Sequence, residues 1–365
     1  MSKAAELANL IGNINAGGGG VNRNVIINGA MNVAQRSTSE TGLGASSGYF
    51  TVDRFKMVCN NTAGRFTMTQ DSSAPDGFAN SLKLACTTAD TSIAANEEFG
   101  ILYRMEGQDL QHFKKGTSSA YPTTLSFYVK GNASATYVAE LMDSDNSSRH
   151  IGATFNVTTD WTRVEITFPG DTTGTLDDDA NASLDLQFFL HAGSNNTSGT
   201  LQTSWGALAQ TNRAVGISSF FDSTDRTFFI TGVQLEVGQN PTEFEREPFD
   251  VTRRKCFRYF EKVEVTAGSY AHIGYAYTST FTRSKQTYEK KRANPTFSFD
   301  NQGDVVVFYN GSSSDTNPNW NYHDAGPNSC RVSATLTGVS TTQGYAVAAY
   351  VNGSSTYNIK VDAEL

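Results

Sequence analysis

Short runs of β-branched and aromatic residues recur along most of the chain, separated by clusters of Asn, Gly, Ser and Asp. Each run has the length of one β-strand, and the residues between runs are those that tight turns favour. Residues 162–168 alternate polar and apolar side chains, and residues 184–190 carry an apolar residue at every second position. This alternation is typical of strands with one buried face. The sequence therefore predicts an all-β protein built from antiparallel sheets that pack face to face.

The length and composition of the chain favour two β domains. With 365 residues, the chain can form more than one domain with a core of its own. Only 18% of the residues are charged and 32 are Gly, which suits short strands joined by many turns. We predict a β-sandwich over residues 24–250 and a smaller C-terminal β-sandwich over 263–365. The connector between them, residues 251–262, is predicted to be a short helix or a bridging strand.

The predicted strands can be placed along the chain by residue range. In the larger domain they are residues 66–69, 81–85, 101–105, 124–130, 135–141, 153–157, 162–168, 184–190 and 227–237. In the smaller domain they are residues 273–282, 287–290, 296–300, 305–309, 331–336, 344–351 and 357–365. Asn352-Gly353 separates the last two strands and predicts a hairpin between them.

Residues 24–55 open the larger domain. The β-branched run at 25–27 stops at Asn28-Gly29, a dipeptide that accepts positive φ and therefore predicts a tight turn. Residues 30–34 are predicted to be a second extended piece. A polar loop then follows to Gly48, and the aromatic segment 49–55 is predicted to be a strand.

The N-terminus holds the one helix that the sequence predicts, over residues 2–14. Ser2 can cap it, and Gly17–Gly20 follows as a flexible linker. Three turns are marginally stable alone in water, so an apolar face predicts a partner: a small bundle with other copies, or a second protein. The alternative is a partly ordered terminus. The residues predicted to form the anchoring face are Ala4, Leu7, Ala8, Leu10 and Ile11.

Charge and cysteine usage exclude several classes of function. A net charge of −8 argues against binding to a nucleic-acid backbone, which needs clustered Lys and Arg. The four cysteines are isolated, so zinc is disfavoured and buried, reduced thiols are predicted. No apolar run approaches the roughly 20 residues of a membrane helix, and no signal-peptide core is found at the N-terminus.

The sequence carries no catalytic motif, and we do not expect an enzyme. The five histidines are scattered, without an HExxH, GxSxG or phosphate-loop pattern. Asp143 with Asp145, and residues 177–179, are predicted to be exposed turn carboxylates, which leaves open a structural calcium ion. No cofactor is predicted. Two acids at the separation of a glycoside hydrolase are not readable from sequence, because that separation is a three-dimensional quantity.

The longest polar loop predicted in the C-terminal domain is residues 310–328, which reads NGSSSDTNPNWNYHDAGPN. Aromatic faces beside Asn and Asp side chains are suited to sugars, because apolar sugar faces stack on rings while hydroxyls are hydrogen bonded. The alternative is that the aromatic residues fold back as a small local core. The predicted binding residues are Trp320, Tyr322, His323 and Asp324.

Several short segments, distributed in order over nearly the whole chain, carry a resemblance to a known family. They are NVIINGAMNVAQR at 24–36, YFTVDRF at 49–55, EGQDL at 106–110, LSFYVK at 125–130, WTR at 161–163, VQLEVG at 233–238, PTEFE at 241–245, RRKCFRYF at 253–260, RANPT at 292–296 and VDAEL at 361–365. The chain therefore resembles a tail or head fibre protein of a bacteriophage.

This resemblance implies a fold and a role. The larger domain would be a jelly roll similar to carbohydrate-binding modules, and the C-terminal domain would be the tip that contacts the host. The protein would be a homotrimer, assembled in the bacterial cytoplasm and held in the virion by its N-terminus. Its partners would be other virion proteins and a host surface glycan or receptor, with no nucleic acid and no membrane insertion. The alternatives are a structural decoration or adaptor protein without receptor binding, and a polysaccharide depolymerase.

Overall fold

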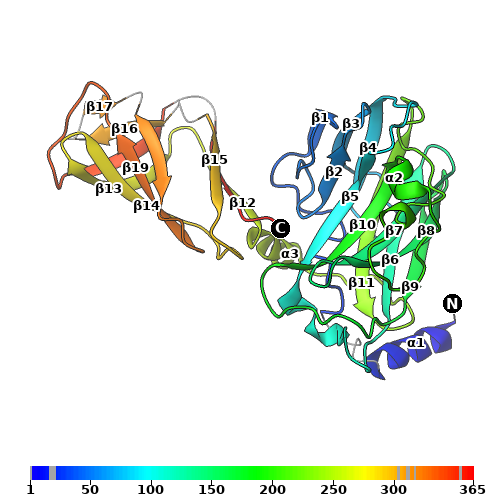
Figure 1. Cartoon of the computed structure of the whole chain (residues 1–365). Helices are drawn as coiled ribbons and strands as arrows, with labels where there is room; N and C mark the ends of the chain where they lie inside the picture. Colours follow the sequence, from blue (N-terminus) through cyan, green and yellow to red (C-terminus); the bar gives the residue numbers. More distant parts are fainter. Residues whose placement is uncertain (1, 16–21, 302–304, 310–312, 316–317, 353–355) are drawn as a thin grey trace. The chain divides into compact units, whose positions relative to one another are not determined.

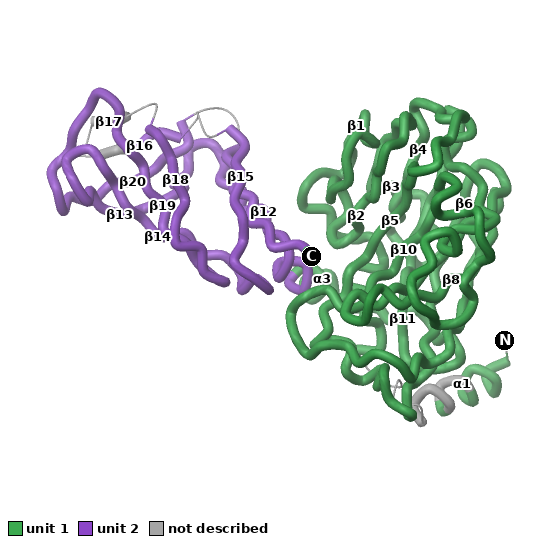
Figure 2. The backbone as a smooth tube through the Cα atoms, in the orientation of Figure 1, with its two compact units in different colours: residues 1–253, 365 green, residues 254–364 purple. Residues whose placement is uncertain are grey.

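The computed structural model describes residues 2–15, 22–301, 305–309, 313–315, 318–352 and 356–365. The chain divides into two compact units (Figure 2). Unit 1 comprises residues 1–253 with residue 365, and unit 2 comprises residues 254–364. Each unit is described by itself below.

Unit 1 is a sandwich of two antiparallel sheets (Figure 1). Its six-stranded sheet has the order β1-β3-β4-β11-β6-β9, and its five-stranded sheet the order β2-β5-β10-β7-β8. This is the predicted jelly-roll β-sandwich. The strands are β1 (Ser39–Leu43), β2 (Lys56–Asn60), β3 (Arg65–Asp71), β4 (Ser81–Thr88), β5 (Glu98–Glu106), β6 (Thr123–Gly131), β7 (Ala135–Asp143), β8 (Arg149–Val157), β9 (Thr162–Phe168), β10 (Ala182–Ala192) and β11 (Thr227–Val237).

The core of unit 1 lies between these two sheets. Alternate residues of each strand point into it, and aromatic rings fill much of its volume: Phe127, for example, meets Phe188 of the facing sheet edge-on, with ring centroids 5.1 Å apart. Short helical segments lie in the connections. They are η1 (Gly107–Asp109), η2 (Gln111–Phe113), α2 (Ser194–Thr197) and η3 (Gln210–Asn212).

The opening of unit 1 confirms one local prediction and corrects two. The turn at Asn28-Gly29 is present: Asn28 has φ 64°, and Met31 N–H donates to its carbonyl at 2.9 Å. Residues 31–34 are not in a strand. The strand predicted at 49–55 is wrong, because residues 51–54 form bends and a turn, and β2 begins only at Lys56. The reason is that Asp53 turns inward, where its carboxylate accepts the N–H of Gln35 at 3.0 Å.

Every strand predicted between residues 66 and 237 is present, but the burial of β10 differs from the prediction. Apart from its first residue, both faces of β10 are buried. The connection between β10 and β11 covers the outer face of the five-stranded sheet: His150 of β8 pairs with Gly206, and Arg213 reaches Glu140 of β7. The alternation in the sequence therefore identified β10 as a strand, but it did not show that the second face of β10 is buried too. The polar loop predicted up to Gly48 also contains a strand, β1.

The predicted N-terminal helix is confirmed as α1 (Lys3–Asn15), with Ala5 N–H donating to the Ser2 hydroxyl at 3.3 Å. Four of the predicted anchoring residues have exposed side chains: Ala4, Leu7, Ala8 and Ile11. The Leu10 side chain and the linker at residues 17–20 lie outside what the structure describes. In the described part of the chain, no helix is long and apolar enough to cross a membrane.

Unit 2 is a smaller β-sandwich. A three-stranded sheet, β12-β21-β15, packs on a seven-stranded sheet, β17-β16-β20-β13-β14-β19-β18. Helix α3 (Phe249–Phe257) leads into it from unit 1. Its strands are β12 (Phe260–Val265), β13 (Tyr270–Thr278), β14 (Phe281–Thr287), β15 (Thr296–Asp300), β16 (Val305–Tyr309), β17 (Ser313–Asp315), β18 (Asn319–His323), β19 (Ser329–Thr335), β20 (Ala346–Val351) and β21 (Tyr357–Asp362).

Several local predictions in unit 2 are wrong. Residues 273–282 form two strands joined by a turn, and residues 288–290 are not in a strand. No hairpin joins the last two strands, because β20 pairs with β13 and β16 while β21 pairs with β12 and β15. Gly353 itself lies outside the described residues. The connector is both a helix and a strand, α3 and β12.

Candidate functional site

Three of the four residues predicted to bind a ligand, Trp320, Tyr322 and His323, lie on strand β18 and not in a loop, and Asp324 follows directly after it. Because side chains alternate along a strand, Trp320 and Tyr322 face the core of unit 2, whereas His323 faces solvent. Tyr322 stacks on Phe299, with ring centroids 4.2 Å apart, and its hydroxyl lies 2.7 Å from that of Tyr357. Burial, with the neighbouring Tyr357, raises the Tyr322 pKa well above its usual range. The two aromatic residues are therefore part of the core and are not presented together with His323.

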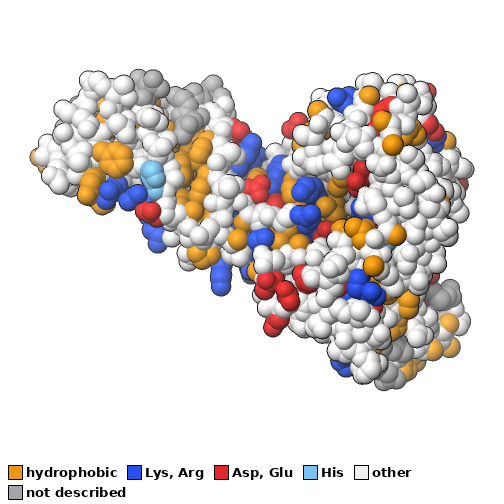
Figure 3. All heavy atoms as spheres, viewed as in Figure 1, with side chains coloured by type: hydrophobic (Ala, Val, Ile, Leu, Met, Phe, Trp, Pro, Cys, Tyr) orange, Lys and Arg blue, Asp and Glu red, His pale blue; other side chains and the backbone are white. Residues whose placement is uncertain are grey.

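The outer face of the seven-stranded sheet carries a different set of aromatic side chains. Ile273, Tyr275 and Tyr277 alternate along β13 and are 72%, 47% and 42% exposed. An exposed row of large apolar side chains on one strand is unusual for a soluble protein surface. Figure 3 shows hydrophobic side chains beside Lys and Arg side chains on this part of unit 2. We call this surface the tyrosine face; its residues are Ile273, Tyr275, Tyr277, Arg283, Lys285, Asn321, His323, Asp324 and Arg331.

A shallow groove of about 450 Å³ crosses the tyrosine face. Its apolar lining comes from Ile273 and Tyr275 of β13, and its charged lining from β14, β19 and the turn after β18. Asp324, one of the predicted binding residues, lies in this groove and pairs with Arg331 at 3.2 Å. The charged residues of the lining are Arg283, Lys285, Asp324 and Arg331.

Strand register places these side chains side by side. Tyr275 of β13 is paired with Arg283 of β14, and Lys285 of β14 is paired with Arg331 of β19. Arg331 is in turn paired with His323 of β18. Side chains of directly paired residues lie on the same face of a sheet, within about 5 Å at Cβ. The face therefore combines an apolar row on β13 with a row of nitrogen-bearing side chains across β14, β19 and β18.

The sequence contained a signal for this face. IGYAY at 273–277 places a large side chain at every second position within a predicted strand. The sequence left undecided which set of side chains points outward, because Ala276, between the two tyrosines, is apolar as well. The structure buries Ala276 and exposes the larger residues on either side of it.

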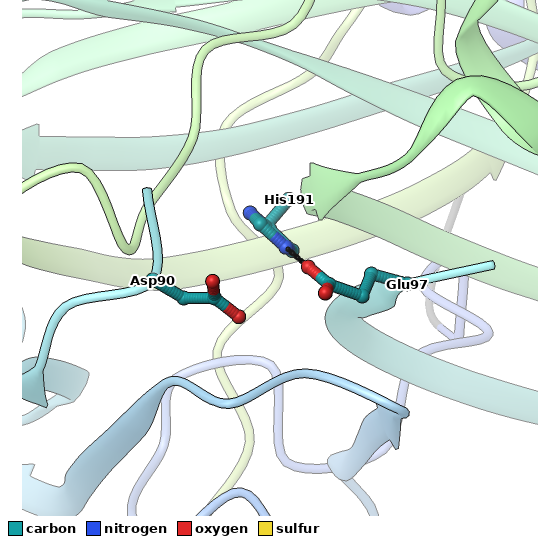
Figure 4. Close-up of side chains that lie close together, drawn as sticks. All are labelled: Asp90, Glu97 and His191. Atoms are coloured by element: carbon teal, nitrogen blue, oxygen red, sulfur yellow. Dashed lines mark hydrogen bonds and ion pairs between the residues drawn. The ribbon is translucent and has the colours of Figure 1, made fainter. Parts of the chain in front are cut away.

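A second polar cluster lies inside unit 1 and consists of Asp90, Glu97 and His191, all buried (Figure 4). Both carboxylates point toward the imidazole, and one ligand atom from each residue lies within 4.8 Å of the others. These three side chains could hold a divalent ion. They are also hydrogen bonded within the protein, since His191 Nε2 lies 2.9 Å from Glu97 Oε2.

Hydrogen bonds explain the state of Asp90. Burial by itself would raise its pKa, but the Ala63 N–H, the Thr62 hydroxyl and the nearby His191 outweigh burial and lower it. The Ala63 N–H donates to Asp90 Oδ2 at 2.8 Å and the Thr62 hydroxyl at 3.1 Å. Asp90 is thus an ionised carboxylate held by neutral donors, which is a structural arrangement that is complete within the chain.

The other acidic residues of the sequence analysis occupy two kinds of environment. Asp143 is fully buried and forms an ion pair with Lys115, so its predicted role as an exposed turn carboxylate is wrong. Lys115 also pairs with Asp171 at 3.1 Å. Asp177 and Asp178 are exposed, and Asp179 is half-buried. All four cysteines are buried free thiols, as predicted.

The outer face of the five-stranded sheet in unit 1 is filled by a charged network. Glu140 is fully buried and accepts hydrogen bonds from Arg213 Nε at 3.1 Å to each of its oxygens. His150 Nδ1 lies 2.8 Å from the same carboxylate. The connection between β10 and β11 covers these side chains, so this network is buried. The tyrosine face of unit 2, by contrast, is an exposed sheet surface that offers aromatic and polar groups together.

Comparisons with known proteins are limited to solved structures: no protein-family model and no curated protein matches the sequence. The chain is similar to the enzymatically active domain of tailspike protein 4 of bacteriophage CBA120, at 11% identity and a TM-score of 0.31. That match covers 59% of this chain and 21% of the tailspike chain.

Two carbohydrate-binding modules are also similar. A family 11 module of a Clostridium thermocellum cellulosomal cellulase has 15% identity and a TM-score of 0.28, with 53% of this chain and 92% of that chain covered. A xylan-binding domain of family 22 has 10% identity and a TM-score of 0.30, with 57% and 99% covered. These values are too low for the likeness to carry an argument about this chain.

Proposed function

We propose that this protein is a non-enzymatic adhesin that binds glycans through the tyrosine face of unit 2. The observation that carries the proposal is the row of Ile273, Tyr275 and Tyr277, exposed along one strand and flanked by polar and charged side chains. Sugar rings have apolar C–H faces that stack on tyrosine rings, and hydroxyls that need donors and acceptors at the edge of the ring. Asp324 and Ser284 supply such groups in the groove that Ile273 and Tyr275 also line, and Asn321 is exposed on β18 of the same sheet.

The rigid sheet suits this role. The side chains of the tyrosine face project from paired strands, so their spacing is set by the sheet and little order has to be created when a ligand binds. A shallow groove open along its length accommodates one stretch of a long polysaccharide without enclosing its ends. Affinity for one such surface is weak, and several copies on one particle raise it through multivalency.

The ordered sequence motifs support a place for this adhesin in a bacteriophage fibre, with α1 as the segment that holds it in the virion or joins its copies. Leu7 and Ile11 are 57% and 48% exposed on α1. An amphipathic helix of this length is stable only when its apolar face is covered. Light scattering should give three times the chain mass of 39.5 kDa if the protein is a homotrimer. Leu7→Glu with Ile11→Glu should lower that mass if α1 joins the copies.

The binding proposal is tested with a glycan array and whole bacterial cells, using the full chain. We expect specific binding by the wild type and a loss of at least about tenfold in affinity for Tyr275→Ala, because an aromatic anchor is removed. Leu208→Ala in unit 1, where Leu208 is 43% exposed, is the matched control and should bind normally. Equal binding by Tyr275→Ala and the wild type, or no glycan bound by the wild type, would overturn the proposal.

A second readout separates binding from turnover. The polysaccharide that binds best is incubated with the protein, and its reducing ends are measured over time. A non-enzymatic adhesin leaves them constant. Their steady increase would instead identify a depolymerase.

A further inference from the structure

We infer that the glycan bound by the tyrosine face is acidic, and that Arg283, Lys285 and Arg331 hold its anionic substituent. The inference rests on the proposed function and names the class of sugar: one that carries a carboxylate, sulfate or phosphate group. Three independent features of the groove point to this ligand: its charge, its strand register and its unpaired donors.

The first feature is the charge of the lining. Arg283, Lys285 and Arg331 are cationic, and Asp324 is the one acidic residue among the lining residues. Asp324 pairs with Arg331 at 3.2 Å, which leaves the charges of Arg283 and Lys285 without an ion-pair partner among the described residues. The whole chain has a net charge of −8, so a cationic groove is a local departure from its average surface.

The second feature is the strand register. Lys285 and Arg331 are directly paired across β14 and β19, and His323 is paired with Arg331 on its other side. Like charges on directly paired residues of a sheet are destabilising. Pairing Lys285 with Arg331 therefore lowers the stability of the sheet locally. Unfavourable pairs of this kind are found at functional sites. An anion seated between Lys285 and Arg331 removes the repulsion.

The third feature is the unpaired donors. The Nε atoms of Arg283 and Arg331 are buried and have no hydrogen-bond acceptor in the part of the chain that the structure describes. A buried donor without an acceptor is costly, and such groups in native proteins call for an explanation. The edge of a guanidinium that carries Nε matches the two oxygens of a carboxylate, sulfate or phosphate.

The position of Arg283 indicates where the anionic group lies relative to the sugar ring. Its guanidinium carbon lies 3.4 Å from the centroid of the Tyr277 ring, so the tyrosine holds the guanidinium in place. Tyr275, the strand partner of Arg283, lies on the same face. A sugar ring on Tyr275 therefore places its acidic substituent next to Arg283.

The test uses the full chain on an array of bacterial surface polysaccharides in matched pairs, each acidic polymer beside its carboxyl-reduced, desulfated or dephosphorylated form. We expect binding to acidic members and at least about tenfold weaker binding to their neutral forms. Equal binding to both members of each pair would overturn this inference and leave the proposed function standing. No binding to any polysaccharide would overturn both.

Variants then test which residues bind the anionic group. For the acidic polymer that binds best, we expect Lys285→Gln and Arg331→Gln each to weaken binding about tenfold and to reduce its dependence on salt concentration. Lys285→Arg keeps the charge and should bind within about twofold of the wild type. Because Lys285→Gln removes a like-charge pair, its melting temperature should not fall. Unchanged affinity and salt dependence in both glutamine variants would contradict the assignment.

Discussion

Arg283 lies over the ring of Tyr277, with its guanidinium carbon 3.4 Å from the ring centroid. The two residues come from neighbouring strands, β13 and β14, and the contact is on the outer face of the sheet. Stacking on an aromatic ring orients an arginine without neutralising it. The pair therefore supplies a pre-oriented cation at the edge of an apolar row.

The first prediction follows from this contact. Tyr277→Phe keeps the ring beneath Arg283, and we expect affinity for an acidic polysaccharide to stay within about threefold of the wild type. Tyr277→Ala removes the ring, so Arg283 must be ordered on binding and affinity should fall about tenfold. Titration calorimetry measures both. Equal affinities for the alanine and phenylalanine variants would show that the ring does not position Arg283.

The second prediction concerns neighbouring residues on β18. Tyr322 packs against Phe299 and Phe297 in the core of unit 2, whereas His323 is exposed. We expect Tyr322→Ala to lower the free energy of unfolding of unit 2 by about 3–5 kcal/mol, as loss of a core aromatic does. His323→Ala should change it by no more than about 0.5 kcal/mol. Urea unfolding compares the two, and similar losses for both would contradict the inward orientation of Tyr322.

The third prediction concerns the buried network beneath the β10–β11 connection. Glu140→Gln leaves Arg213 buried without its counter-charge, so we expect a loss of about 3–5 kcal/mol in the free energy of unfolding. Glu140→Leu with Arg213→Met removes both charges together and should cost less than the single change. If the double variant lost as much free energy of unfolding as Glu140→Leu and Arg213→Met lose in sum, the two residues would not be coupled.

The fourth prediction is a pH dependence with opposite signs in the two units. In unit 1, burial raises the pKa of Asp185 to about 6, against the opposing charge of Arg104. The folded state then binds more protons than the unfolded state between about pH 4 and 6, so this term favours folding at low pH and is lost as pH rises. We expect Asp185→Asn to be more stable than the wild type at pH 7, by on the order of 2–3 kcal/mol, with no advantage at pH 4.

In unit 2 the sign is reversed. Burial lowers the pKa of His272 to about 4, so the unfolded state binds more protons between about pH 4 and 6.5. The stability contributed by neutral His272 is present above pH 6.5 and is lost as pH falls through this window. His272→Gln should flatten the pH dependence of unit 2, measured by urea unfolding at pH 7, 5.5 and 4. Parallel curves for the variant and the wild type would contradict the prediction.

The fifth prediction concerns Asp90, Glu97 and His191. Because hydrogen bonds within the chain already hold these side chains, we expect no bound metal by elemental analysis and no change in melting temperature on chelation. His191→Ala should lower the free energy of unfolding by about 3 kcal/mol, since it leaves Glu97 buried without its partner. A melting temperature that falls with chelator and recovers with one added metal would instead identify a metal centre.

Local pattern predicted much of this fold. The strand from 227 to 237 was predicted with the bounds that the structure shows, because its β-branched and aromatic residues end where polar turn residues begin. The N-terminal helix was predicted from its capping serine and apolar spacing, and both are properties of neighbouring residues. The strand predicted at 49–55 was wrong because a distant partner, the 33–35 segment, bonds to Asp53 and turns the chain.

Half of the residues predicted to bind a ligand lie on the face that we propose as the binding site. Of the four residues predicted, His323 and Asp324 belong to the tyrosine face, and Trp320 and Tyr322 belong to the core. The polar composition of 310–328 suggested a loop, yet β18 forms there because β19 offers it a paired edge. The sequence of this segment does not by itself show that β19 offers it a pairing edge.

The sequence by itself determined nine of the eleven strands of unit 1, the turn at Asn28-Gly29 and the N-terminal helix, because each depends on residues close together in the chain. Only the tertiary structure decided which side of β13 faces water. It also decided that Arg283 and Lys285 of β14 and Arg331 of β19 lie on that side. Strand alternation leaves two faces to choose between, and the choice is made by the sheet that packs on one of them. The inward-facing residues of β13 meet the core of unit 2, so Tyr275 and Tyr277 are left outside, beside Arg283.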